Sequence, residues 1–476
     1  MKNMRKLRIG LAGVMTTPFR GDKEGNFQED WQALSKLANS LGFELKTIKE
    51  GIYNQDQANN AARELQNWGA DFILLQNSSF AAGQFIYPFA DTKIRLGLWA
   101  VTEGKPTSEG GLPLNSFTGL NLYNSLLKTF RTDYNLPVKW FFGRPGQPLF
   151  DQRLRVTVQA LHAVINLQNS RIGLIGGVAS GFDNLIVDPR NLKRKIGAEV
   201  IILDFDTLLK EAQAIKDQTA IQTTAEGFIR VNTQFDKRMV PQLEKLSRLE
   251  IAYQHAADNF GLDAVAVSCW PRYQSDYGVA VCSLMGQLNS TGLIAACEGD
   301  VPSAAGMLAL HYMSSGDVVT LMDLVTVDEN DDSVLLWHCG PTSPILADNK
   351  GTRMQSLWLF DQDQKPPTGL HNDLVLKPGE ATVMGFTPDF EQLLVLDGEI
   401  DNQKPSYVGS RGWYRNLRVG AEPASVPDVV QTLMNSGYQH HYPLAYGNLM
   451  PAAMEMAGWL GIKPIKKQTY TDYLIQ

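Results

Sequence analysis

The chain has 476 residues, 44% hydrophobic and 20% charged, which is long enough for two or three domains with ordinary globular cores. Its formal net charge is −7 and it has no long run of lysine and arginine, which argues against a nucleic-acid or anionic-membrane surface. The four cysteines form no CxxC pair, so we expect buried free thiols in a reducing compartment.

The first residues, "MKNMRKLRIGLAGVM", are basic and then briefly apolar, a pattern that a secretory signal peptide also shows. Arg8 interrupts the apolar run and no clear cleavage site follows. No segment approaches the roughly 18 uninterrupted apolar residues of a membrane span. We therefore expect a cytoplasmic protein.

An internal repeat organises the first two thirds of the chain: "RIGLAGVMTTPF" at residues 8–19 recurs as "RIGLIGGVASGF" at residues 171–182. Each copy is a short apolar strand that runs into a glycine turn, which is typical of the start of a doubly wound α/β unit. Neither copy is G-x-G-x-x-G or a P-loop, so backbone turns are favoured over dinucleotide binding. We predict two Rossmann-like domains, residues 1–168 and 169–345.

The stretch "SCWPRYQSDYG" follows a predicted strand in the second of these domains. It offers Trp270, Arg272, Tyr273 and Gln274 as sugar contacts, because aromatic faces stack on sugar C–H surfaces and Arg or Gln can bond hydroxyls. Arg272 could equally bind an anionic group. An ordinary strand-to-loop aromatic cluster is the structural alternative.

Two acids end the next buried strand, in "TGLIAACEGDVPS". Glu298 lies just beyond the carboxyl end of this strand, where open α/β sheets bind their ligands. A charge there is costly unless it is paired or binds a metal, so Glu298 is a candidate metal ligand. Asp300 is expected to support the ligands or to begin the following helix. Cys297 and His311 are interpreted as packing residues.

A β-hairpin is predicted in "TLMDLVTVDENDDSVLLWH", where Asp323 interrupts an apolar strand and His338 ends the next. If the turn is centred between Asn330 and Asp331, Asp323 faces His338 with Cβ atoms about 4.5–5.5 Å apart. A slip of one residue would turn them to opposite faces. A plain Asp–His pair is the structural alternative.

Beyond residue 345 short strands alternate with Lys-Pro-Gly and Asp-Gly turns, which predicts a β-rich, barrel-like domain over residues 346–476 with a returning helical tail. This part contains "YQHHYPLAYGNL", in which His440 and His441 are adjacent and Tyr442 follows. Adjacent side chains in an extended segment point opposite ways, so we expect at most one histidine to face a given site.

Glutamate, aspartate and histidine together form an oxygen-plus-imidazole ligand set. Such a set suits Mn²⁺ or Mg²⁺ better than the thiolate-rich sites of structural zinc. Two metal-bound carboxylates could pass a proton between neighbouring carbons of a hydroxy-carbonyl compound. That reaction is aldose–ketose isomerisation through an enediol.

These segments resemble the L-fucose/L-arabinose isomerase superfamily, in which an "EGD"-like segment follows a strand and a second acid lies about 25 residues later, as Asp323 does here. The resemblance implies that Glu298, Asp323 and His441 bind Mn²⁺, with Mg²⁺ or Co²⁺ as alternatives, and that the two acids also move protons. His338 matches an extra histidine of arabinose-type members, whereas an aspartate at position 323 is fucose-type. His440 and Tyr442 join the candidate substrate contacts.

The resemblance also implies two Rossmann-like domains followed by a β-rich domain, in a trimer or hexamer whose neighbouring N-terminal domain helps close the site. We therefore predict a metal-dependent aldose–ketose isomerase of a free monosaccharide of the fucose or arabinose type. One alternative is an isomerase of a sulfonated sugar, converting sulfoquinovose to sulfofructose. A non-catalytic sugar-binding protein and, last, a dinucleotide-dependent oxidoreductase are alternatives from other classes.

Overall fold

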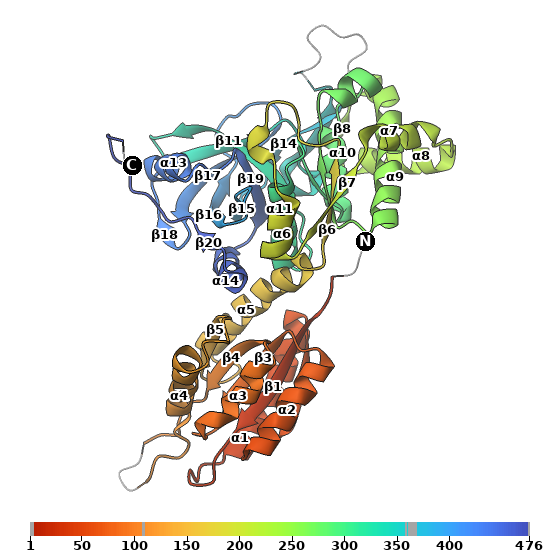
Figure 1. Cartoon of the computed structure of the whole chain (residues 1–476). Coiled ribbons are helices and arrows are strands. Elements are labelled where there is room, and N and C mark those ends of the chain that lie inside the picture. The colour runs from red at the N-terminus through yellow and green to blue at the C-terminus, as the bar shows by residue number, and fades with distance from the viewer. Residues whose placement is uncertain (1–3, 107–109, 358, 360–368, 475–476) are drawn as a thin grey trace. The chain divides into compact units, whose positions relative to one another are not determined.

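The computed structural model describes residues 4–106, 110–357, 359 and 369–474. The chain divides into two compact units, Arg5–Ile165 and Asn166–Gln476, the latter joined by the first four residues (Figure 1). Two parallel sheets and one large mixed sheet confirm the predicted α/β class. The division into three domains stays a prediction. Within the described ranges, no helix is long and apolar enough to cross a membrane.

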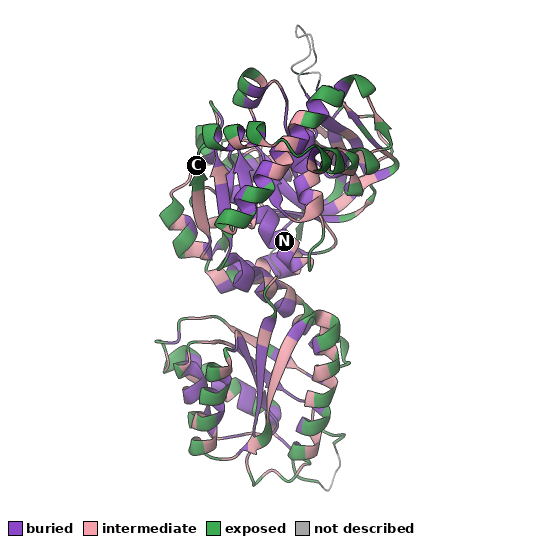
Figure 2. Cartoon of the chain, turned by 90° about the vertical axis from the view of Figure 1, so that its right-hand side faces the viewer, coloured by how far each residue is buried: buried purple, intermediate pink, exposed green. Residues whose placement is uncertain are grey.

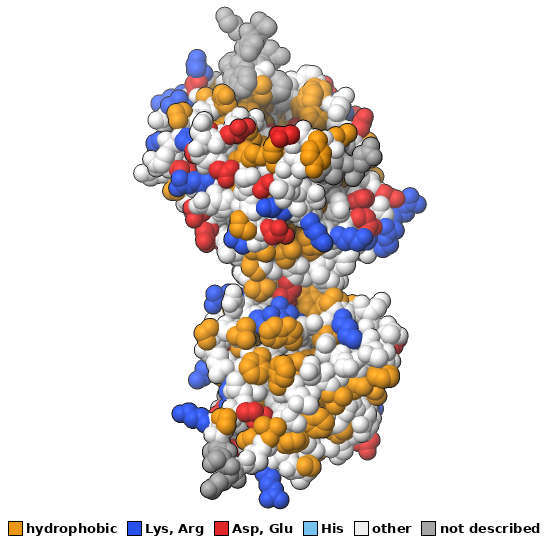
Figure 3. Space-filling view, turned by 90° about the vertical axis from the view of Figure 1, so that its left-hand side faces the viewer, with side chains coloured by type: hydrophobic (Ala, Val, Ile, Leu, Met, Phe, Trp, Pro, Cys, Tyr) orange, Lys and Arg blue, Asp and Glu red, His pale blue; other side chains and the backbone are white. Residues whose placement is uncertain are grey.

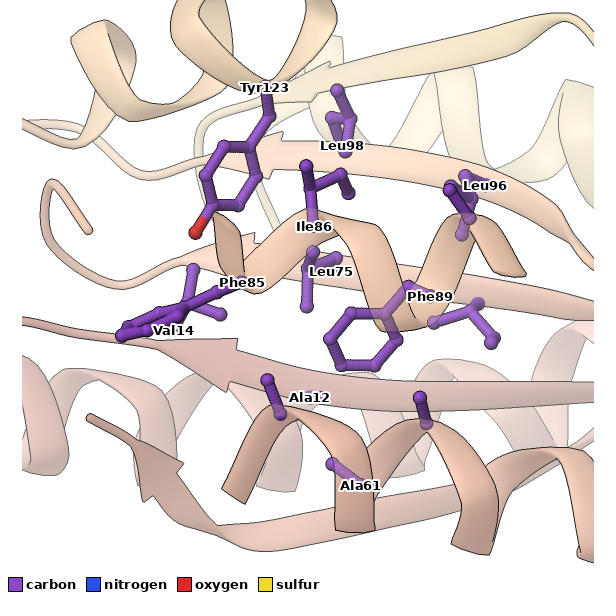
Figure 4. Packing of buried hydrophobic residues seen from close by; sticks show 14 of the residues in the cluster. Ala12, Val14, Ala61, Leu75, Phe85, Ile86, Phe89, Leu96, Leu98 and Tyr123 are labelled. Atoms are coloured by element: carbon purple, nitrogen blue, oxygen red, sulfur yellow. The ribbon is translucent and has the colours of Figure 1, made fainter. Parts of the chain in front are cut away.

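The first unit is built on a five-stranded parallel sheet in the order β2-β1-β3-β4-β5. Its strands are β1 (Leu7–Val14), β2 (Phe43–Ile52), β3 (Phe72–Asn77), β4 (Arg95–Ala100) and β5 (Val138–Phe142), and its helices are α1 (Lys23–Leu41), α2 (Gln55–Trp68), α3 (Tyr87–Asp91), α4 (Ser116–Thr129) and α5 (Pro148–Leu167). Central strands of such a sheet are covered on both faces, which explains the nearly continuous apolar sequences of β1 and β3. Figure 4 shows Leu75 and Leu98 of the sheet packed with Phe89 and Tyr123 of the helices.

The second unit begins with a four-stranded parallel sheet in the order β10-β9-β6-β7. Its strands are β6 (Arg171–Ile175), β7 (Glu199–Leu203), β9 (Ala264–Val267) and β10 (Ile294–Ala296), and the helices that accompany it are α6 (Pro189–Ile196), α7 (Phe205–Ala214), α8 (Gln218–Arg230), α9 (Val240–Phe260), α10 (Cys282–Thr291) and α11 (Val301–Met313). The strands β9 and β10 are buried throughout, and α10 and α11 are largely buried, whereas α6 to α9 also carry exposed residues, as the mixed colours of the helices in Figure 2 indicate.

The carboxyl ends of β6 and β10 are tied together at one edge of this sheet. The Ala179 amide donates a hydrogen bond to the Glu298 carbonyl at 2.9 Å. Gly299 has a φ of +75°, and a Cβ atom on it would lie 2.2 Å from the Gly177 carbonyl oxygen. Glycine at position 299 therefore allows the two loops to touch.

The rest of the second unit carries an eleven-stranded mixed sheet, along the path β20-β16-β15-β19-β11-β12-β17-β14-β13-β8 with β18 beside β17. Because β16 also pairs with β17, six strands from β16 to β17 close into a ring. The strands are β8 (Gln234–Phe235), β11 (Thr320–Asp328), β12 (Ser333–His338), β13 (Ala347–Gln355), β14 (His371–Leu376), β15 (Gly379–Phe386), β16 (Gln392–Asp401), β17 (Ser410–Val419), β18 (Glu422–Pro423), β19 (His441–Tyr446) and β20 (Lys463–Pro464), and the helices are α13 (Val426–Ser436) and α14 (Met450–Leu460).

The boundary predicted at residue 345 falls within the run of strands that forms this sheet. The strands β11 and β12, which the prediction assigned to the second Rossmann-like domain, pair with β19 and β17. Their apolar sequences are as compatible with this sheet as with the parallel one, so composition alone did not show to which sheet these strands belong.

The predicted register of the β11–β12 hairpin is correct near the turn and wrong further away. Asp328 pairs with Ser333 and Thr326 with Leu335, as expected, but a bulge between Leu324 and Thr326 shifts the ladder by one residue. Asp323 therefore lies opposite Trp337 rather than His338. A bulge adds one residue to a single strand, which the alternation of side chains does not reveal.

Candidate metal centre

Glu298 lies immediately after β10, at the strand end where the sequence predicted a ligand. Its φ of +60° lies in the left-handed region, which is uncommon for a residue with a side chain and is frequent at functional sites. One carboxylate oxygen, Oε2, accepts a hydrogen bond from His440 Nε2 at 3.1 Å and lies 3.5 Å from His441 Nε2.

His440 and His441 both reach Glu298, so the expectation that only one would face the site is wrong. His441 is the first residue of β19, whereas His440 precedes the strand. The alternation of side chains holds only within extended backbone, so it does not constrain His440. His441 pairs with Asp323 across the β19–β11 ladder, and its Nε2 lies 3.8 Å from Asp323 Oδ1.

His338 completes the group from the end of β12. Its Nδ1 accepts a hydrogen bond from the Cys339 amide at 2.8 Å, which fixes the ring, and the ring stacks on that of His441 with centroids 5.6 Å apart. Ligand atoms of Asp323, His338 and His441 lie within 4.8 Å of one another, as do those of Glu298, His440 and His441. Residues from three separate parts of the chain thus converge around His441.

Three atoms in this group are buried without a hydrogen-bond partner among the described residues: Asp323 Oδ1, His338 Nε2 and His441 Nε2. An unsatisfied buried polar atom costs about 1–3 kcal/mol, so three together need an explanation. A single divalent cation between them would satisfy Asp323 Oδ1 and His441 Nε2 at once, and it would take the place of the proton that His338 Nε2 carries while Nδ1 accepts the Cys339 amide. The donor set of carboxylate oxygen and imidazole nitrogen fits the predicted Mn²⁺ or Mg²⁺.

The acids and histidines also shift one another's protonation. Burial would raise the pKa of Glu298, but the hydrogen bond from His440 and the charges of His441 and His338 bring this pKa below its ordinary value. Burial lowers the pKa of His338, but the Asp323 carboxylate and Cys339 together outweigh it and raise the pKa to about 9. The site therefore attracts positive charge, and a metal ion would take the place of protons there.

Two aromatic rings lie beside the histidines. The Phe182 ring is 5.2 Å from that of His440, and the Trp270 ring meets Phe182 edge-on at 6.1 Å. Trp270 was predicted as a sugar contact, but Phe182 was missed, because the 171–182 repeat was interpreted only as a backbone turn. The aromatic residue that follows the glycines of that turn was the available signal.

The other predicted substrate contacts have partners elsewhere. The exposed Arg272 guanidinium bonds Asp206 and Asp276 and lies 4.2 Å above the Phe205 ring. The Gln274 amide donates to the Cys269 carbonyl at 3.2 Å. Their roles toward a substrate stay predictions, and Arg272 would have to leave two carboxylates to bind an anion.

Tyr442 and the predicted packing residues have contacts of their own. Tyr442 is part of the hydrophobic core of the large sheet, next to Tyr438. Cys297 contacts the sulfur of Met285, and the His311 ring bonds the Asp317 carbonyl, which agrees with packing roles. All four cysteines are free thiols, three of them buried and Cys339 half-buried.

Comparison with known proteins identifies the class of enzyme. No family model matches the chain. The sulfoquinovose isomerase of Priestia megaterium is 27% identical over 400 residues, covering 83% of this chain and 84% of that protein. The sulfoquinovose isomerase of Alkalicoccus urumqiensis is 27% identical over 392 residues (81% and 84%), and that of Clostridium sp. is 24% identical over 401 residues (82% and 85%).

Among solved structures, a sugar transport substrate-binding protein from Bordetella parapertussis matches 67% of this chain and 84% of its own at 12% identity, with a TM-score of 0.17 that carries no structural argument. Membership of the fucose/arabinose superfamily stays a prediction. The curated relatives confirm the predicted enzyme class: the chain is an aldose–ketose isomerase.

Proposed function

We propose that this isomerase depends on a divalent metal and acts on a sulfonated aldose, converting sulfoquinovose to sulfofructose. Relatives named sulfoquinovose isomerase, similar over more than four fifths of the chain, support this substrate over the fucose or arabinose type that we first predicted. The metal is supported above all by three buried, unsatisfied ligand atoms that converge on one point.

Glu298, Asp323, His338 and His441 would hold the ion. A bound Mn²⁺ would act as a Lewis acid on the oxygens of C1 and C2 of the open-chain sugar. His440 approaches the same Glu298 oxygen as His441 and donates a hydrogen bond to it at 3.1 Å. That bond keeps the Glu298 carboxylate ionised and oriented, which a proton acceptor requires.

Isomerisation moves one proton from C2 to C1 and one between the two hydroxyl oxygens. A carboxylate removes the C2 proton while O1 gains a proton, which gives the enediol. The O2 proton then leaves while C1 gains one, which gives the ketose. Glu298 and Asp323 come from different elements on either side of His441 and serve as the two proton carriers.

The sugar itself would lie against the aromatic rings of Phe182 and Trp270. Phe182 borders His440, which bonds Glu298, and Trp270 borders Phe182, so a substrate against Phe182 would lie beside the acid. Apolar C–H faces of sugars stack on such rings, while the hydroxyls remain free for polar contacts. This arrangement would position the sugar through its apolar faces and would leave Glu298 and Asp323 free to move protons.

The surface of the first unit supports association of the chain with a second copy of itself. Five apolar side chains on this unit are 46–70% exposed: Leu112, Phe117, Phe130, Trp140 and Leu149. Phe117 and Trp140 line a common cavity beside the edge strand β5, and Figure 3 shows hydrophobic side chains gathered on this face. Contiguous exposed apolar surface marks association sites. Light scattering after size exclusion should give an oligomeric mass, which Trp140→Lys should lower.

The test of the proposed function is NMR in D₂O of EDTA-treated protein with and without Mn²⁺. Sulfoquinovose should give sulfofructose only with the metal and should gain deuterium at C1. L-Fucose and L-arabinose serve as comparison substrates. Conversion of one of them instead of sulfoquinovose would favour the isomerase of the fucose or arabinose type that we first predicted. Sugar binding that survives metal removal, with no turnover, would favour a binding protein.

A further inference from the structure

Asp300 is a fully buried carboxylate, 0% exposed, that uses each of its oxygens for a different purpose. Oδ1 accepts the Ser303 amide at 2.8 Å and thereby caps the N-terminus of α11. Oδ2 accepts a hydrogen bond from His441 Nδ1, also at 2.8 Å, across 141 residues of sequence. One side chain thus links the loop that carries Glu298 to the strand that carries His441.

The bond to Asp300 decides which nitrogen of His441 holds the proton. An ionised carboxylate only accepts, so Nδ1 must donate and Nε2 is left with its lone pair. That Nε2 is the atom that lies 3.5 Å from Glu298 and 3.8 Å from Asp323. Without Asp300, the two nearby acids would favour a proton on Nε2, where it would block a cation.

The segment before β19 is held by two further bonds, one of them to α11. Gln439 donates to the Ser303 hydroxyl at 3.1 Å, and the Tyr438 hydroxyl donates to the His441 carbonyl at 3.1 Å. These bonds hold the backbone in place, so they would persist if Asp300 lost its charge. The effect of Asp300 on the imidazole ring is therefore separable from the anchoring of the strand.

We infer that Asp300 is a positioning residue that presents His441 Nε2 to the metal; this inference rests on the proposed function. Carboxylates that accept the second N–H of a metal-bound histidine orient the ring and raise its basicity. A residue that only caps a helix does not need the second bond, the one that Asp300 makes to His441. Asp217, for comparison, caps α8 through the amides of Thr219 and Ala220.

The change Asp300→Asn separates the two roles. If the Asn oxygen keeps the Ser303 amide, its NH₂ group faces His441 Nδ1 and forces the proton onto Nε2. Titration of the metal-free protein with Mn²⁺, followed by the EPR signal of the free ion, should show an affinity about 10–100-fold below that of the unaltered protein. Asp217→Asn removes a charge at another helix cap and should leave Mn²⁺ affinity unchanged.

Asp300→Ser provides a second variant should Asp300→Asn fail to fold, because a serine hydroxyl still caps a helix but does not reach the histidine. It should also lose Mn²⁺ affinity. In both variants a high Mn²⁺ concentration should restore most of kcat, which would not repair a misfolded site. Unaltered affinity in folded Asp300→Asn or Asp300→Ser overturns the inference alone. Failure of the unaltered protein to bind Mn²⁺ would overturn the proposed metal dependence.

Discussion

The two copies of the repeated sequence, residues 8–19 and 171–182, differ in local structure and in surroundings: β1 continues through Gly13, whereas β6 ends before Gly176 and Gly177, which both have a φ of +77°. Both begin a parallel sheet, as β1 and β6. Beside β1, the strand β3 ends in the neutral amides Gln76 and Asn77. In the sheet of β6, the strand β10 is followed by Glu298, and the loop after β6 is bonded to that residue through Ala179.

A buried acid of the first unit, Asp30, is used differently from Glu298. Asp30 of α1 accepts a hydrogen bond from Gln76 and lies 3.6 Å from Arg144, inside the first unit. Glu298 meets histidines that come from a different sheet. The end of a parallel strand therefore fixes where a sheet can carry a site, and the chemistry depends on the residues that neighbouring strands supply.

Among the changes that compare the two copies, Glu298→Gln should have the largest effect on activity. Glutamine keeps the shape of the side chain but cannot accept a proton, so kcat should fall by about 10²–10⁴-fold. Steady-state rates at saturating Mn²⁺ exclude a simple loss of the ion. Asp30→Asn, the matched change at the acid of the first unit, should retain kcat. An equal loss in both variants would remove the functional distinction between the copies.

His338→Ala removes one of the three unsatisfied atoms and should weaken Mn²⁺ binding by about 100-fold or more, since changes of mere ligand supports already cost 10–100-fold. The EPR titration of free Mn²⁺ measures this loss directly. His162→Ala alters a histidine of α5 in the first unit and should leave the affinity unchanged. Retained affinity in His338→Ala would limit the ligands to Glu298, Asp323 and His441.

Where local rules apply, sequence reasoning selected residues that the structure brings together. Glu298 was predicted because strand ends in parallel sheets bind ligands, and the histidine pair because two imidazoles are adjacent in a turn-rich segment. The helix-starting and supporting roles expected of Asp300 both occur in one side chain. Each of these predictions depends on residues within a few positions of one another.

What failed depends on contacts between distant segments. Because of the bulge between Leu324 and Thr326, Asp323 does not pair with His338 in the hairpin. The histidine that pairs with Asp323 is His441 of β19. The pairing of Arg272, a candidate for binding an anion, with Asp206, 66 residues away, was also not foreseen, and its role toward a substrate stays a prediction. No local pattern encodes such pairings, because they depend on how separate elements pack.

The buried Asp30 should make the stability of the first unit depend on pH. Burial raises the pKa of its carboxyl group from 3.8 to about 6, against the opposing effect of Arg144. The folded state therefore binds more protons than the unfolded state between about pH 4 and 6, so stability falls as pH rises through this range, by at most about 3 kcal/mol. Asp30→Asn should lack this component. Urea unfolding of both proteins from pH 4 to 7 would show it as a change in their difference, and a constant difference would contradict it.

Phe182 gives the smallest expected effect and the most direct comparison with an aromatic residue outside the site. Phe182→Leu keeps an apolar side chain but removes the flat ring beside His440, and an aromatic contact is worth about 0.5–1.5 kcal/mol. We therefore expect KM for the sugar to rise by about 2- to 12-fold, with Mn²⁺ affinity unchanged. Phe260→Leu, the same change at a 46% exposed ring, should leave KM unaltered. If KM stayed constant in Phe182→Leu while Trp270→Leu raised it, the sugar would contact only the far side of the aromatic pair, and the second copy of the repeat would position the site without touching the substrate.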